Sequence, residues 1–194
     1  MLALHALRHG YKTTIYTCNL QMFDPSWFAA GSPRIQDRLL AQAQVKSDPK
    51  LQEATKAYLQ FLELGGTVRM VDITSPLIAR ILKTQTPIIT GLSATWLYRC
   101  HRERPDNLEP DDVAGEPVGH FVVVHGLDSQ TRLATVADPY FQEPYPASHT
   151  YKVNVDRLVG AILLGIVTFD AKLLLIKPGE GNKGNFDVHS VRRK

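Results

Sequence analysis

The sequence predicts an α+β fold in which helices come first and a mostly antiparallel sheet follows. In the first half of the chain, apolar residues recur at helical spacing between residues 51 and 62. In the second half, short β-branched runs are separated by turn residues at 128–130. The length of 194 residues fits one domain with a substantial core.

The first half is expected to supply most of the helices. Apolar residues at helical spacing place 1–9 in a helix that Gly10 ends, and we expect this helix to begin upstream of Met1. The clearest helix opens with Asp48 as N-cap and Pro49 at its first position, and two glycines end it. Further helices are expected at 34–45 and 75–82, and strands at 13–17, 68–73 and 87–92.

The second half is expected to supply most of the sheet. A stretch rich in proline and acidic residues at 102–118 predicts a long surface loop. Strands are expected at 121–124, 131–136, 151–153 and 172–177, and a helix at 155–164. The polar segment 178–194 is predicted to be disordered, which leaves 1–177 as the folded domain.

A histidine and an aspartate lie on the two strands of a predicted hairpin. His120 precedes the apolar run Phe121–Val124, which is typical of a strand buried on both faces. Residues 131–136 alternate between polar and apolar, as in a half-buried strand, and Asp138 follows them. This pattern is typical of the His–Asp half of a nucleophile–base–orienter triad. The same spacing also fits a hairpin that carries the two residues by chance.

The length of the hairpin loop decides whether these two side chains meet. If Ser129 is the centre of an odd-numbered loop, His120 and Asp138 lie directly opposite each other, with Cβ atoms about 5 Å apart. A two-residue loop would instead pair His120 with Pro139 and put Asp138 on the other face of the sheet. His125 is an odd number of residues from His120, so the two rings are expected to point to opposite faces.

Composition and the absence of known motifs limit which partners and cofactors the sequence predicts. The formal charge of +3 comes from the segment 177–194, which carries five basic and two acidic residues, so residues 1–176 carry equal numbers of each sign. Nucleic-acid binding is therefore not expected. The chain has no metal-binding motif and no phosphate-binding loop, so we expect no metal and no cofactor. No apolar run is long enough to span a bilayer, and two cysteines without a signal peptide favour the cytoplasm.

The chain resembles the bacteriocin-processing type of papain-like cysteine peptidase, and more narrowly a stand-alone bacterial branch of that group. The resemblance extends from Met1 to about Pro178 and rests on Leu2–Leu4 through Gly10-Tyr11, Pro87–Ile89, Gly119–Val123 and Ala137–Pro139. It implies a papain-like fold, hydrolysis of a peptide or protein substrate by a Cys-His-Asp triad, and no cofactor.

The resemblance also implies the role of each triad residue. His120 would be the general base and Asp138 its orienter. In the family, the nucleophilic cysteine opens, as Cys-Gly-Pro, the helix that holds a run like Leu2–Leu7, and a glutamine before it completes the oxyanion hole. Both residues would precede Met1, so the chain as it stands is expected to be inactive. Cys18 follows a predicted strand and Cys100 lies in a basic stretch, so each is expected to be a free structural thiol.

Four residues ahead of the long loop are candidates for a substrate groove, namely Thr90, Gly91, Ser93 and Trp96. An aromatic residue at this place is equally typical of the edge of a hydrophobic core. Two other functions stay open beside hydrolysis. One is a non-catalytic peptide- or protein-binding domain derived from such a peptidase, and the other is an acyl-transferring enzyme with the same triad.

Overall fold

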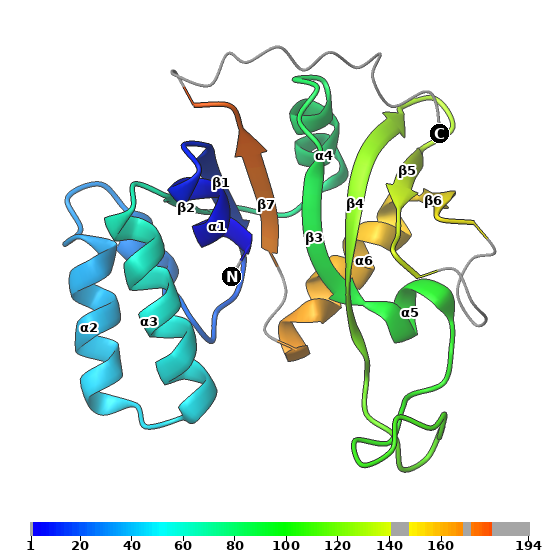
Figure 1. Cartoon of the computed structure of the whole chain (residues 1–194), viewed down its shortest axis with the longest axis horizontal. Coiled ribbons are helices and arrows are strands. Elements are labelled where there is room, and N and C mark those ends of the chain that lie inside the picture. The colour runs from blue at the N-terminus through cyan, green and yellow to red at the C-terminus, as the bar shows by residue number, and fades with distance from the viewer. Residues whose placement is uncertain (1, 141–147, 169–171, 180–194) are drawn as a thin grey trace.

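The computed structural model describes residues 2–140, 148–168 and 172–179, and it contains one sheet with helices on both faces (Figure 1). The strands are β1 (Lys12–Thr17), β2 (Thr67–Met70), β3 (Ile88–Ser93), β4 (Gly119–Asp128), β5 (Leu133–Ala137), β6 (Thr150–Asn154) and β7 (Lys172–Lys177). Their order across the seven-stranded sheet is β2-β1-β7-β3-β4-β5-β6. Among the strand pairs of the described residues, only β1–β2 is parallel, which confirms a mostly antiparallel α+β fold.

Capping residues and glycines set where the helices begin and end. They are α1 (Leu2–Arg8), α2 (Ile35–Val45), α3 (Pro49–Glu63), α4 (Ser75–Leu82), α5 (Ala94–Tyr98) and α6 (Val155–Leu164), with 3-10 turns η1 (Pro25–Phe28) and η2 (Gly165–Thr168). The Asp48 carboxylate caps α3 by accepting a hydrogen bond from the Leu51 N–H at 2.7 Å. Gly10 follows α1 with a φ of 77°, a conformation that favours glycine at a helix C-terminus.

The two faces of the sheet bury separate hydrophobic clusters. Helices α1, α2 and α3 cover one cluster, which includes Ile15 and Phe61. Helices α4, α5 and α6 cover the other, which includes Leu92 and Ile162. Strand β7 lies in the middle of the sheet and contributes alternate residues to both, with Leu174 on the α1 side and its two neighbours on the α6 side. The strand therefore joins the two layers.

Several expected boundaries are confirmed, and some are wrong. The helix at 155–164 and the strand at 172–177 have the predicted bounds. Strand β2 ends at Met70, three residues earlier than expected, and the short helix α5 was not predicted. The predicted burial of β4 on both faces is wrong, because Phe121 is 49% exposed. Helices α1 and α3 pack on β1, β2 and β7, so they leave this face of β4 uncovered.

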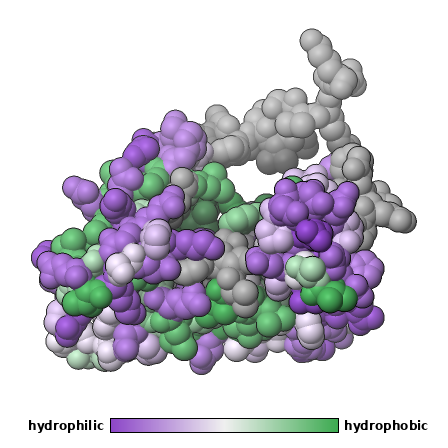
Figure 2. Space-filling view, turned by 90° about the horizontal axis from the view of Figure 1, so that it is seen from below, coloured by the Kyte–Doolittle hydropathy of each residue, from purple (hydrophilic) through white to green (hydrophobic). Residues whose placement is uncertain are grey.

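The rest of the surface is mixed in character. Viewed from below, hydrophobic side chains form several separate patches among hydrophilic ones (Figure 2). No helix in the described ranges is both long and apolar enough to cross a membrane. Residues 180–194, for which disorder is predicted, lie outside the described residues, and the division of the chain at residue 177 stays a prediction.

Candidate functional site

His120 and Asp138 are in direct contact. The Nε2 atom of His120 lies 2.7 Å from Oδ1 of Asp138. His120 is the second residue of β4, and Asp138 directly follows the end of β5. The side chain of Asp138 is fully buried and that of His120 is 14% exposed, so the carboxylate is shielded while the imidazole reaches the surface.

The route by which the two residues meet differs from both predicted registers. Strand β4 pairs with β5 so that Val123 lies opposite Ala137, which places Asp138 level with Val122 and diagonal to His120. Four residues, 129–132, connect the strands, and the register shifts between Val124 and Gly126. Without this bulge Asp138 would lie level with Val123, on the other face of the sheet. The extra residue in β4 therefore brings the carboxylate to the face of the imidazole.

Asp138 accepts hydrogen bonds at both oxygens. Beside His120, the backbone N–H of Tyr140 donates to Oδ1 at 2.8 Å. The hydroxyls of Tyr98 and Tyr151 both donate to Oδ2, the second at a distance of 3.2 Å. Burial by itself raises the pKa of Asp138, but the hydrogen bonds from Tyr98, His120 and the Tyr140 N–H outweigh it and lower that pKa below its usual value. The carboxylate is therefore ionised at neutral pH.

The backbone around Asp138 is also fixed. Its N–H donates to the carbonyl of His149 at 2.8 Å, and Nδ1 of His149 donates back to the Asp138 carbonyl at 3.0 Å. The rings of Tyr98 and Tyr140 meet the His120 ring edge to face, with centroids 6.3 and 5.9 Å away. These contacts restrict the orientation of the imidazole.

The contact with Asp138 determines which nitrogen of His120 can act as a base. Because the carboxylate is ionised, Nε2 carries the hydrogen and donates it to Oδ1. In the neutral ring Nδ1 then holds the lone pair. A histidine in this tautomer can accept a proton at Nδ1, and the carboxylate stabilises the imidazolium that results.

Neither cysteine matches the nucleophile of a Cys-His-Asp triad. Both thiols are partly buried, Cys18 after β1 and Cys100 after α5, and neither shares a hydrogen bond with His120 in the described part of the chain. Burial raises the pKa of the Cys18 thiol, and the charge of Asp72 adds to this effect. Burial likewise raises the pKa of Cys100, with a smaller contribution from Glu103. A raised pKa reduces the thiolate fraction that a nucleophile needs.

The four groove candidates do not share one surface. Thr90 is 1% exposed and its hydroxyl donates to the Lys172 carbonyl at 2.9 Å. Ser93 is buried and caps α5 by accepting a hydrogen bond from the Trp96 N–H. Trp96 is half exposed, and the Arg157 guanidinium lies over its ring at 5.5 Å. Gly91 lines a pocket.

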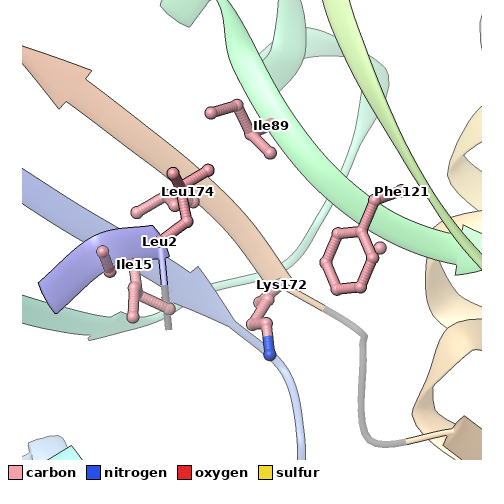
Figure 3. Close-up of a pocket in the computed structure, with 8 residues that line it drawn as sticks. Leu2, Ile15, Ile89, Phe121, Lys172 and Leu174 are labelled. Atoms are coloured by element: carbon pink, nitrogen blue, oxygen red, sulfur yellow. The ribbon is translucent and has the colours of Figure 1, made fainter. Parts of the chain in front are cut away.

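That pocket is apolar and lies on the face of the sheet opposite His120. It has a volume of about 320 Å³, and its walls include Leu2 of α1, Ile89 and Gly91 of β3, and Leu174 of β7. Phe121 closes one side, facing Leu2 across the pocket (Figure 3). Phe121 directly follows His120, and successive side chains of a strand point to opposite faces of the sheet. The pocket and the imidazole are therefore separated by the backbone of β4.

The sequence did not predict that Tyr98 and Tyr151 are hydrogen-bond partners of Asp138. Tyr98 and Tyr151 are 53 residues apart, and each follows an ordinary apolar or polar neighbour. Their only sequence signal is that aromatic residues with a hydroxyl need a hydrogen-bond partner when they are buried. This rule does not indicate which residue the hydroxyl will bind until the fold is known.

In the described residues, no three His, Cys, Asp or Glu side chains gather as metal ligands. Comparisons of the chain with family models, with curated proteins and with solved structures found no match.

Proposed function

We propose that the His120–Asp138 pair is the base and orienter of a papain-like site that cleaves amide bonds through a thiol. The observation that carries the proposal is the 2.7 Å contact of a partly exposed imidazole with a fully buried carboxylate. A buried carboxylate bonded to one ring nitrogen is the arrangement that orients a general base. The resemblance of Gly119–Val123 and Ala137–Pro139 to cysteine peptidases supports the choice of a thiol over a hydroxyl nucleophile.

The proposed chemistry follows from the tautomer of His120. Nδ1 accepts the S–H proton of the nucleophilic cysteine, and the thiolate attacks the carbonyl carbon of the substrate. The C–N bond then breaks as Nδ1 returns the proton to the leaving amine. Water hydrolyses the thioester and regenerates the thiol, with the same imidazole as the base. Cys18 and Cys100 do not match the nucleophile in position or in pKa, so the proposal does not assign this step to either.

The test uses the protein as its gene encodes it, with any in-frame codons ahead of Met1 included. Cleavage of a diverse peptide library is followed by mass spectrometry, with and without an added amine acceptor that separates hydrolysis from acyl transfer. We expect His120→Ala to lower the rate by roughly a hundredfold to ten-thousandfold. The double variant Cys18→Ser, Cys100→Ser is the control and should retain activity. Cleavage that survives His120→Ala would contradict the proposal.

A non-catalytic peptide-binding domain is the second candidate. It is favoured by the raised pKa of both thiols and by the open apolar pocket beside Phe121, which would accept an apolar side chain. In this case the library would yield bound peptides and no cleavage products. Binding should weaken on Phe121→Ala and be unaffected by His120→Ala.

A further inference from the structure

We propose that Tyr98 and Tyr151 are positioning residues that set how strongly Asp138 holds the His120 imidazole. The inference deepens the proposed function and rests on it, because it assigns a role to two residues that act on the base only through its orienter. The observation behind it is that two hydroxyls converge on one oxygen of a carboxylate whose other oxygen binds the imidazole.

The geometry of the tyrosine pair is specific. Both hydroxyls donate to Oδ2 of Asp138, and the two hydroxyl oxygens are 2.9 Å apart. Oδ1 is left to His120 and to the Tyr140 N–H. From the described residues the carboxylate therefore accepts four hydrogen bonds, which matches its number of lone-pair sites. Removing one hydroxyl would leave a buried anion with an unfilled site.

Regular secondary structure holds both tyrosines in place. Tyr151 lies in β6, directly opposite Val136 of β5. Tyr98 ends α5, and hydrogen bonds connect this helix to the residue before β4 and to helix α6. The Ala94 N–H donates to the Val118 carbonyl at 2.9 Å, and the Arg157 guanidinium of α6 donates to the Leu97 carbonyl at 3.0 Å. The hydroxyls therefore reach Asp138 from a fixed framework, which is what a positioning role requires.

The direction of the effect follows from competition for the carboxylate. Two hydroxyl donors withdraw electron density from Asp138, so they weaken its attraction for the imidazolium N–H. The titratable groups in contact with the pair include Tyr98 of α5, Tyr151 of β6, Tyr140 and His149. Loss of a tyrosine hydroxyl should therefore raise the proton affinity of His120. Loss of the carboxylate charge should lower it.

The experiment is a titration of the His120 ring by NMR, with its signals assigned from their loss in His120→Asn. Tyr98→Phe and Tyr151→Phe are each expected to raise the proton-binding constant of His120 roughly threefold, since each removes one donor to a charged group. Tyr16→Phe is the matched control, because Tyr16 of β1 packs against the same hydrophobic cluster as Tyr98 and Tyr151. It should leave the titration unchanged. Two tyrosine variants are used so that one remains if the other fails to fold.

Asp138→Asn separates the two claims. If it leaves the His120 titration where it was, the proposed His–Asp pair itself fails. If it lowers the proton affinity while both tyrosine variants leave it unchanged or lower it, the pair stands and the inference about Tyr98 and Tyr151 is overturned. A loss of stability without any change in the titration would show that the tyrosines only support the fold.

Discussion

At the residue scale, a fully buried carboxylate is costly unless each oxygen finds donors, and Asp138 meets this condition. Its four hydrogen bonds come from β4, from α5, from β6 and from the backbone of Tyr140. Because these donors are far apart in the sequence, the carboxylate is satisfied only in the folded protein. Its ionisation is therefore coupled to stability.

This coupling predicts the pH dependence of Asp138→Asn. The folded protein lowers the pKa of Asp138, so the carboxylate stabilises the fold fully above its ordinary pKa, and this contribution is lost as the pH falls through the lower, folded value. At pH 7 the variant should be about 1–3 kcal/mol less stable than the wild type, because hydrogen bonds to a charged group are lost. The difference should shrink below about pH 4. Urea unfolding at both pH values measures it, and an equal difference at pH 7 and pH 3 would argue against the coupling.

At the element scale, the bulge in β4 determines the site. Val124 pairs with Val136 and Gly126 with Thr135, so His125 is the additional residue on β4. His125 is exposed, and β4 pairs with β3 only as far as Val124. The strand therefore has a regular register on both sides of His125.

The bulge predicts opposite results for two single-residue deletions. Deleting His125 removes the bulge and keeps Val124 opposite Val136, so the His120–Asp138 contact should survive. Deleting Val123 moves His120 to the other face of the sheet, where it cannot reach Asp138. The titration of His120 by NMR distinguishes the two variants, since only a ring in contact with Asp138 responds to Asp138→Asn. A response lost in both deletions would contradict this account of the register.

The elements differ in how well the sequence predicts them. The helix at 155–164 follows from its own apolar spacing, and the strand at 172–177 from its apolar run, so both have the predicted bounds. The sequence left open whether His120 and Asp138 meet, and both registers that it offered differ from the observed one. A bulge depends on pairing with a second strand, and the sequence of one strand does not show it. The tyrosine partners of Asp138 depend on the tertiary contact between Tyr98 of α5 and Tyr151 of β6, which no local sequence pattern indicates.

At the scale of the whole molecule, β7 connects two hydrophobic layers. It pairs with β1 on one side and with β3 on the other, although it lies near the end of the described chain. Leu173 and Leu175 pack on the α6 side and Leu174 on the α1 side. Without this strand the sheet would divide into β2-β1 and β3-β4-β5-β6, and each layer would lose leucine side chains from its core, so the two layers should unfold together.

The two tryptophans of the chain test this cooperativity. Trp27 packs against the cluster on the α1 side, whereas Trp96 belongs to α5 on the other side. Two variants, Trp27→Phe and Trp96→Phe, each leave a single tryptophan as a fluorescent reporter of one layer. For each variant, unfolding by denaturant is followed both by tryptophan fluorescence, which reports on one layer, and by circular dichroism, which reports on the whole chain. The two midpoints of the same variant should coincide. A fluorescence midpoint that departs from the circular dichroism midpoint would indicate two separate units.

The proposed function requires that Asp138 fixes His120 as a base at Nδ1. The most direct measurement is the ¹⁵N chemical shifts of the His120 ring at a pH where the ring is neutral. We expect a protonated Nε2 and an unprotonated Nδ1, with a change in this tautomer balance in Asp138→Asn. A hydrogen on Nδ1 in the wild-type protein would contradict the account, because the lone pair would then face Asp138 and the site would have no base.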